Sequence, residues 1–208
     1  IGSFGDLSIL SFAGNKVLTT GEGGAVLTDS KILYEKLKLI RSHGRKDLSN
    51  YFLSSDSPKY VSLGYNWRMS SITAALGISQ LKKLNMLISM RQKNAQSYYE
   101  KLHKIKEIQC PVPPSNSTHV YQLYSILLPN HKIQKNLKNF LTKKGIMTKI
   151  FFEPIHSTPF YRQIFGNTIN LPMTSLISKK ILSLPLYPTM SKKEINYVCN
   201  SIIQFFDN

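Results

Sequence analysis

A cluster of glycines between two β-prone runs restricts how this chain can begin its fold. The residues Gly-Glu-Gly-Gly at 21–24 separate the runs at 7–12 and 24–28, which are rich in Leu, Ile and Val. Glycine adopts backbone conformations that other residues avoid, so such a cluster is typical of a turn between strands. The pattern predicts two strands joined by this turn, followed by a helix that Asp29 caps and that ends at Gly44.

The remainder of the chain alternates predicted helices and strands after one long polar stretch. Residues 45–67 show no periodic apolar pattern and predict a loop. A helical pattern with interruptions then runs from Ser70 to about residue 105. The later elements are predicted, in chain order, as a strand at 121–128, a helix at 132–144, a strand at 146–152, an irregular stretch to 174 and a short helix after Thr174. A last helix begins at Ser191, where Ser191 and Glu194 match a capping box.

The charge of the chain is strongly positive but evenly spread. Its 27 basic and 11 acidic residues give a formal net charge of +16, which could attract nucleic acid or acidic membranes. Pairs of lysines at helical intervals, such as those at 82–83 and 192–193, are typical of solvated helix faces instead.

No apolar run approaches the roughly 18 residues that cross a bilayer. Cys110 and Cys199 lack metal-ligand spacing and fit a reducing compartment. We expect a cytoplasmic protein without nucleic-acid, membrane or metal partners.

Lys16 is the candidate for chemistry at the start of the chain. It follows the first predicted strand, among small residues and before the glycine-rich turn, where a side chain can reach a closely approaching ligand. Its spacing alone favours an ordinary exposed lysine in a hairpin. The glycine cluster does not match a nucleotide-binding P-loop, since no Gly-Lys-Ser/Thr step follows it.

Several motifs in fixed order resemble the signature of the DegT/DnrJ/EryC1/StrS family of sugar aminotransferases. They are Ser-Phe-x-x-x-Lys at 11–16, Thr-Thr-Gly-Glu-Gly-Gly at 19–24, Arg-x-His-Gly at 41–44, Gly-Tyr-Asn-Trp-Arg-Met at 64–69 and Leu-Pro-Leu-Tyr-Pro at 184–188. The resemblance covers essentially the whole chain, and several ordered motifs are far more specific than one. It implies a dependence on pyridoxal phosphate (PLP).

The resemblance also implies roles for individual residues. Lys16 would form the Schiff base with PLP and act as the general base, and a lysine there favours transamination over dehydration. Ser11 would contact the cofactor phosphate, and Asn66 would reach the phosphate from the neighbouring subunit of a homodimer. Arg68 is either a donor to a carboxylate or phosphate of the substrate or part of a structural ion pair. His156 would lie on a loop at the mouth of the site, whereas His43 is interpreted as a helix cap or dipole partner.

The implied architecture is α/β, the PLP-dependent transferase fold type I that resembles aspartate aminotransferase. Residues 1–90 would form the C-terminal part of the large PLP-binding domain, and 91–208 a small C-terminal α+β domain. Family members place a phosphate-binding turn, an aromatic residue stacked on the cofactor ring and an Asp at the ring nitrogen upstream of the position of Ile1. We therefore expect these 208 residues alone to be inactive.

The resemblance implies that an amino-acid donor, for which glutamate is expected, gives its amino group to a nucleotide-linked keto-deoxy-sugar. Such a reaction would serve polysaccharide biosynthesis. The positive charge would suit a diphosphate-linked substrate. The alternative is a catalytically inert basic domain that binds nucleic acid or an acidic partner. Lys16 within an intact motif favours the enzyme, because an inert domain has no need of it.

Overall fold

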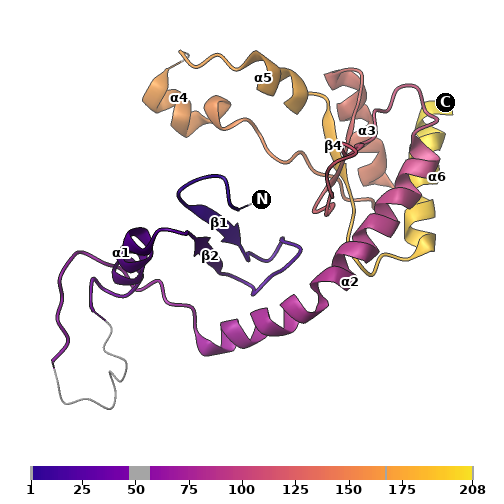
Figure 1. The fold of residues 1–208 in the computed structure, drawn as a ribbon. Coiled ribbons are helices and arrows are strands. Elements are labelled where there is room, and N and C mark those ends of the chain that lie inside the picture. The colour runs from indigo at the N-terminus through magenta and orange to yellow at the C-terminus, as the bar shows by residue number, and fades with distance from the viewer. Residues whose placement is uncertain (1, 47–56, 167, 208) are drawn as a thin grey trace. The chain divides into compact units, whose positions relative to one another are not determined.

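The structure, a computed structural model, describes residues 2–46, 57–166 and 168–207 (Figure 1). Part of the predicted loop at 45–67, namely residues 47–56, lies outside the described residues. The chain divides into two compact units, Ile1–Leu84 and Asn85–Asn208. The division falls within one long helix, and each unit is described by itself below.

The first unit opens with the predicted pair of strands. Strand β1 (Ser8–Ser11) pairs antiparallel with β2 (Gly24–Leu27), so that Ser8 lies opposite Leu27 and Ser11 opposite Gly24. Glycine is required at position 24 because a Cβ atom there would lie 2.8 Å from the Leu10 carbonyl oxygen. The glycine cluster thus lets the two strands approach closely.

Helix α1 (Lys31–Arg41) follows β2, and its start differs by one residue from the prediction. Ser30, not Asp29, is the N-cap, because its side-chain oxygen accepts a hydrogen bond from the Leu33 N–H at 3.4 Å. The helix ends at Arg41 with Ser42 as its C-cap, three residues before the predicted end, and both His43 (φ 60°) and Gly44 (φ 70°) take the left-handed conformation after it.

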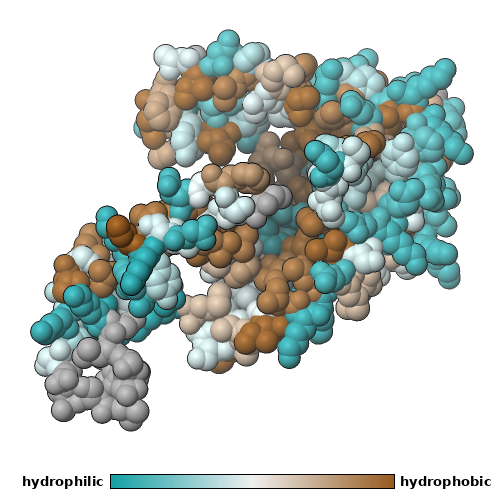
Figure 2. Space-filling model, in the orientation of Figure 1, coloured by the Kyte–Doolittle hydropathy of each residue, from teal (hydrophilic) through white to brown (hydrophobic). Residues whose placement is uncertain are grey.

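Helix α2 (Ser71–Leu102) is continuous, whereas its sequence pattern suggested interruptions. Its first half exposes large apolar side chains, and Figure 2 shows hydrophobic surface over this part of the helix. The exposed apolar side chains of this half include Ile72, Leu76, Ile78, Leu81 and Met86. In its second half, Ala95, Tyr98 and Leu102 are buried in the core of the second unit. The change from an exposed to a buried apolar face explains the weak periodicity of the sequence.

The second unit is built on a pair of antiparallel strands. Strand β3 (Tyr124–Leu127) pairs with β4 (Ile181–Leu184), with Tyr124 opposite Leu184. Single bridges extend this pair on both sides, from Gln109 to Leu127 and from Lys149 to Ser183. The sheet therefore combines segments that are far apart in the sequence.

Two long helices complete the core of the second unit. Asn130 caps α3 (His131–Lys143), and α6 (Lys192–Asp207) packs against α3 through rings of Phe140 and Phe205 whose centroids lie 5.5 Å apart. The capping box predicted at the start of α6 is confirmed, since the Glu194 carboxylate accepts from Ser191 and the Ser191 hydroxyl accepts from the Glu194 N–H. The largest fully buried apolar side chains in this core are those of Tyr98, Leu102, Tyr124, Ile126, Leu137, Leu141, Leu182, Cys199 and Ile202.

The region between α3 and α6 differs most from the prediction. The predicted strand at 146–152 is wrong: the chain alternates buried and exposed residues there, but only Lys149 pairs with β4. The irregular stretch contains η1 (Ile155–Ser157) and α4 (Pro159–Phe165), and the short helix predicted after Thr174 is α5 (Pro172–Ser178). Strand β4, which follows α5, was not predicted.

A row of side chains on α2 binds the chain that follows β4. Arg91 Nη1 donates to the Leu186 carbonyl at 3.2 Å, and Asn94 Nδ2 donates to the carbonyls of Tyr187 and Pro188. The Tyr98 hydroxyl donates to the Pro185 carbonyl at 2.9 Å. These bonds provide donors for the carbonyl oxygens of a segment that forms no strand after β4. Among the described helices, none is long and apolar enough to cross a membrane.

Candidate active site

A loop closed at its base carries the candidate lysine. The Phe12 N–H donates to the Gly23 carbonyl, and the Phe12 carbonyl accepts from the Thr20 N–H and the Thr19 hydroxyl. These bonds extend the pairing of β1 and β2 by one step and hold residues 13–19 outside the strands. Within this loop the Lys16 N–H donates to the Ala13 carbonyl at 3.0 Å.

Lys16 is half-buried, and its amine forms no hydrogen bond or ion pair with any described residue. Ser11 ends β1 at the base of the same loop and is exposed. Its hydroxyl oxygen lies 3.4 Å from the Ala13 nitrogen, a long hydrogen bond that leaves the hydroxyl able to donate to a ligand. Both groups are thus available for an incoming molecule.

Thr20 packs the glycine turn onto the start of α2. The residue is 6% exposed, and its hydroxyl donates to the Glu22 carbonyl at 2.7 Å. A Cβ atom on Gly77 would lie 3.0 Å from the Thr20 methyl, and one on Gly23 would lie 2.9 Å from the Met69 Cε. Because Met69 ends the Gly-Tyr-Asn-Trp-Arg-Met motif, the lysine loop and that motif meet at Gly23.

A second pair of motifs meets where the chain leaves α1. His43 has a positive φ of 60°, and its N–H donates to the Tyr65 carbonyl at 2.9 Å. Ser42 forms a bridge with Asn66. The segments that carry Arg-x-His-Gly and Gly-Tyr-Asn-Trp-Arg-Met are therefore paired through their backbones.

The pairing brings Asn66, Arg68 and His43 together. Arg68 Nη2 donates to Asn66 Oδ1 at 3.4 Å and lies 3.5 Å from His43 Nε2. All three side chains are exposed, and within the described residues Arg68 forms no ion pair with a carboxylate. Both alternatives for Arg68, a donor to an anionic group of the substrate and a member of a structural ion pair, stay predictions. The sequence assigned His43 only a capping role and did not indicate its approach to Arg68.

The aromatic residues of this motif stack on each other. The rings of Tyr65 and Trp67 lie 4.3 Å apart and are nearly parallel, at an angle of 6°. Both remain exposed, Trp67 at 65%. Because alternate residues of an extended segment point to the same side, this stack leaves Asn66 and Arg68 on the opposite side.

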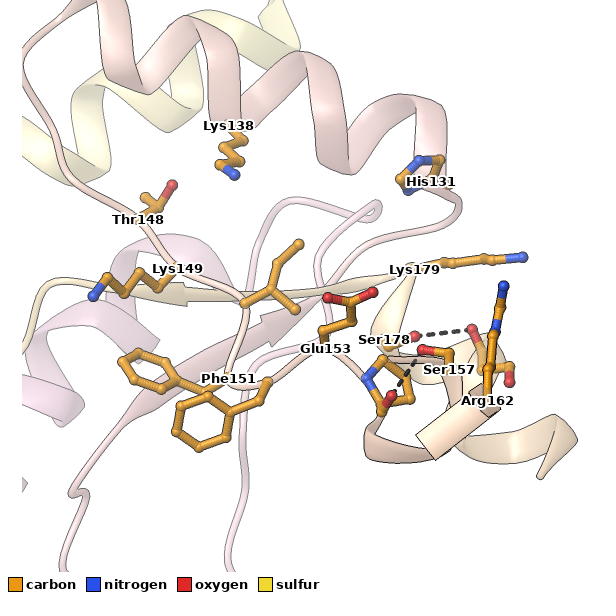
Figure 3. A pocket seen from close by; sticks show the side chains of 14 residues that line it. His131, Lys138, Thr148, Lys149, Phe151, Glu153, Ser157, Arg162, Ser178 and Lys179 are labelled. Carbon is orange, nitrogen blue, oxygen red and sulfur yellow. Dashed lines mark hydrogen bonds between the residues drawn. The ribbon is translucent and has the colours of Figure 1, made fainter. Parts of the chain in front are cut away.

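His156 lies in the second unit, on η1. Its Nε2 is 3.3 Å from the Ser175 hydroxyl, and the ring is half-buried. The neighbouring segment 148–154 lines a hollow of about 810 Å³, to which His131 and Lys138 of α3 also contribute (Figure 3). His119, which the sequence did not assign to the site, accepts a hydrogen bond from the Tyr121 N–H through its Nδ1 at 2.9 Å.

Comparison with solved structures defines the class of protein. Helicobacter pylori PseC, an aminotransferase involved in the biosynthesis of pseudoaminic acid, superposes with a TM-score of 0.90 at 31% identity, over 100% of this chain and 55% of that one. The fold is that of the PLP-dependent sugar aminotransferases of fold type I, as the sequence predicted. The chain belongs to the DegT/DnrJ/EryC1/StrS aminotransferase family, whose model matches residues 1–203.

Curated relatives match along the whole chain. GDP-perosamine synthase of Escherichia coli O157:H7 is 31% identical over 208 residues. UDP-4-amino-4,6-dideoxy-N-acetyl-beta-L-altrosamine transaminase of Campylobacter jejuni (strain 81-176) is 34% identical over 211 residues. Each match covers 100% of this chain and 54% of the relative, so the chain spans about half the length of the curated relatives it matches.

PLP is the cofactor of this family, and the first unit offers groups that fit it. A lysine amine without a described partner can bind an aldehyde covalently, and the exposed hydroxyl of Ser11 can donate to a phosphate. The glycine turn beside the lysine loop is open at Gly21, where a Cβ atom would meet nothing within 4 Å. These residues can thus hold the reactive carbon and the phosphate of such a cofactor.

Proposed function

We propose that the protein containing these 208 residues is a cytoplasmic aminotransferase that moves an amino group from glutamate to a nucleotide-linked keto-deoxy-sugar. The observation that carries the proposal is the free amine of Lys16 on a loop held by Phe12, Thr20 and Gly23. Residues 1–90 would form the end of the large domain and 91–208 the small domain. The names of two relatives, GDP-perosamine synthase and UDP-4-amino-4,6-dideoxy-N-acetyl-beta-L-altrosamine transaminase, contain nucleotide-linked amino sugars and so support the substrate class.

Bound PLP supplies an electron sink that stabilises negative charge at the carbon which loses its proton. Lys16 Nζ would hold the cofactor covalently and, once released by the amino donor, would move the proton from that carbon to the cofactor carbon that the lysine had held. The half-buried setting of Lys16 limits the positions that its amine can reach. Its anchored backbone would keep the amine within reach of a single carbon.

The remaining predicted site residues would bind and orient the cofactor and the substrate. Ser11 would donate its hydroxyl to the cofactor phosphate, and Asn66 would donate its amide to the phosphate bound by a second subunit. Arg68 would offer its guanidinium to an anionic group of the substrate, since His43 and Asn66 are its described neighbours. His156 would contribute its ring from the small domain at the mouth of the site.

Covalent labelling tests the role of Lys16. The protein is incubated with PLP, reduced with borohydride and digested, and the modified peptide is identified by mass spectrometry. We expect the label on Lys16, and we expect Lys16→Ala to lose turnover while its thermal melting stays unchanged, because the Lys16 amine forms no hydrogen bond or ion pair with a described residue. Lys31→Ala, on the exposed start of α1, is the control. A label confined to another lysine would refute the assignment.

Subunit mixing tests the homodimer and the role of Asn66. The Lys16→Ala and Asn66→Ala chains, each expected to be inactive by itself, are purified separately. They are then mixed under conditions that exchange subunits. If Asn66 serves the partner's site, one site of each hybrid dimer keeps both residues and activity returns. Ser11→Ala mixed with Lys16→Ala is the matched control, because Ser11 lies on the same loop as Lys16 and gains nothing from exchange. Equal activity in both mixtures would contradict the proposal for Asn66.

A further inference from the structure

The backbone on both sides of His156 is fixed by a short turn of its own. His156 is the middle residue of η1, and the residues that follow it bond back to the residues that precede it. The N–H and the hydroxyl of Ser157 both donate to the Pro154 carbonyl, at 2.9 and 2.7 Å. The N–H and the hydroxyl of Thr158 donate in the same way to the Ile155 carbonyl, at 3.1 and 2.8 Å. These bonds hold the Cα atom of His156, but they do not determine the direction of its ring.

A hydroxyl on α5 contacts the ring of His156. The Ser175 Oγ lies 3.3 Å from His156 Nε2, and both residues are half-buried. A hydroxyl can donate or accept, so this bond is compatible with either neutral tautomer of the imidazole. Within the described residues, His156 Nδ1 forms no hydrogen bond. The bond to Ser175 therefore engages one nitrogen of the ring and leaves the other available to a ligand.

Helix α5, which carries Ser175, is held at its C-terminal end by Gln134 of α3. Gln134 is 1% exposed, and its Nε2 donates to the carbonyls of Ser178 and Ile181, at 3.1 and 2.6 Å. Its Oε1 lies 3.1 Å from His131 Nδ1, so both ends of the amide have a partner. A buried amide that is satisfied at both ends holds the backbone it binds in one place. The last turn of α5 and the start of β4 are therefore attached to the core.

Hydrogen bonds within α5 connect this attachment to Ser175. The Ser178 hydroxyl donates to the Ser175 carbonyl at 3.1 Å, and Figure 3 marks this bond beside the label of Ser178. The Ser175 N–H donates to the Leu171 carbonyl at 3.0 Å. Past the end of the helix, the Leu128 N–H donates to the Lys180 carbonyl at 3.0 Å and joins this segment to the end of β3. The support of Ser175 is therefore continuous from the buried core.

The contact of the Ser175 hydroxyl differs from that of an ordinary helical serine. Serine hydroxyls within helices commonly bond to a carbonyl one turn earlier, as the Ser178 hydroxyl does here. The Ser175 hydroxyl instead contacts a side chain on another element. Together with the turn of η1, this contact restricts the His156 ring to one orientation. A ring that is oriented in advance loses less conformational freedom when a ligand binds to it.

We propose that Ser175 is a positioning residue, which fixes the ring of His156 through Nε2 so that Nδ1 is the nitrogen offered to the substrate. The inference rests on the proposed function, in which His156 contributes its ring at the mouth of the site. Ser175 itself acts only through His156. The support of α5 by Gln134 keeps the hydroxyl at the distance that this role requires.

Hydrogen exchange at the ring carbon between the two nitrogens of each histidine, measured by mass spectrometry on the whole protein, tests the contact without turnover. In Ser175→Ala the His156 ring gains motion and exposure, so its exchange should become faster, while the other four of the five histidines stay unchanged. Ser175→Thr keeps the hydroxyl and should restore the slower exchange. Thr174→Val is the matched control, because the Thr174 hydroxyl, on the same helix, forms no hydrogen bond with a described residue. Equal exchange of His156 in Ser175→Ala and Thr174→Val would overturn the proposal.

Kinetics of the active protein test whether Ser175 acts through His156. Ser175→Ala should raise the KM of one substrate about fivefold, the effect of one hydrogen bond, with little change in kcat, and Ser175→Thr should recover the lower KM. The double variant with Ser175→Ala and His156→Ala should be no worse than His156→Ala alone, because a positioning residue has no effect once its target is gone.

The outcomes separate the two parts of the proposal. Additive losses in the double variant would overturn it, since Ser175 would then act by another route. Faster exchange of His156 in Ser175→Ala, with unchanged KM in both single variants, would instead overturn the role of His156 toward the substrate. That result would contradict the proposed function of His156 and leave the contact with Ser175 in place.

Discussion

Gly44 and Gly64 approach so closely that a Cβ atom on Gly64 would lie 1.9 Å from the Gly44 nitrogen. A Cβ atom on Gly44 would in turn lie 1.6 Å from the Ser62 carbonyl oxygen. Only glycine avoids these overlaps, and Gly44 also needs its positive φ. The contact holds the segment of His43 against that of Asn66, and with it the cluster that includes Arg68.

Gly64→Ala should therefore destabilise the first unit and displace Asn66. Backbone atoms cannot move aside as a flexible side chain does, so we expect a loss of about 3 kcal/mol or more in the free energy of unfolding. Thermal melting measures the loss. Gly5→Ala is the control, because its Cβ atom would make an ordinary contact of 3.5 Å with the Leu7 carbonyl oxygen. Equal melting of the two variants would contradict the role of the glycine pair.

Glu194 should make stability depend on pH in acid. Hydrogen bonds donated by the Tyr187 hydroxyl and by Ser191 lower the pKa of this carboxyl to about 2 from its ordinary value of 4.5. Because the folded pKa is the lower one, the carboxylate stabilises the protein above about pH 4.5, and this contribution disappears as the pH falls toward 2. Glu194→Gln should lessen the fall in melting temperature across this window, and Glu107→Gln should not.

Tyr98→Phe should destabilise the second unit through one lost hydrogen bond. The Tyr98 side chain is fully buried, and the substitution leaves the Pro185 carbonyl without this donor, at an expected cost of about 1 to 3 kcal/mol. Urea denaturation should show a lower midpoint with an unchanged slope. Tyr99→Phe is the control, because the Tyr99 hydroxyl forms no hydrogen bond with a described residue. A midpoint equal to that of the control would show that the bond contributes nothing.

Arg68→Gln separates ligand binding from a structural role. We expect a raised KM for one substrate and unchanged thermal melting, because the guanidinium is exposed and has no described carboxylate partner. Arg68→Lys should restore activity only in part, since a lysine lacks the planar pair of donors. A large fall in melting temperature with unchanged KM would instead show that Arg68 is structural.

Local signals in the sequence predicted many elements of the fold. The capping box at Ser191 and Glu194 fixed the start of α6, because its donors and acceptors lie within one turn. Strand β4 was missed because a run of four residues before a proline does not distinguish strand from helix. The alternation at 146–152 is real, yet a strand also needs a neighbour, and only Lys149 finds one.

In the candidate site, too, features that depend on neighbouring residues were predictable, and features that depend on distant residues were not. The position of Lys16 follows from the turn residues beside it, which bond to each other within the loop. The approach of His43 to Arg68 spans 25 residues and depends on a positive φ and two touching glycines, for which the sequence has no local signal. The contact of His156 with Ser175 has no local signal either, because it joins η1 to α5 across 19 residues.

The backbone conformation of residues 185–188 depends on side chains of α2 and not on the side chains of residues 185–188 themselves. Arg91, Asn94 and Tyr98 bind carbonyl oxygens, which every amino acid carries, so the side chains at 185–188 contribute nothing to these bonds. The path of the backbone at 185–188 is thus determined by side chains some ninety positions earlier in the sequence, since Arg91 and Leu186 are 95 residues apart. If every position is substituted in turn and stability is measured, most replacements of Arg91 and Asn94 should destabilise the protein. Replacements of Leu186 that leave the backbone conformation unchanged should be tolerated.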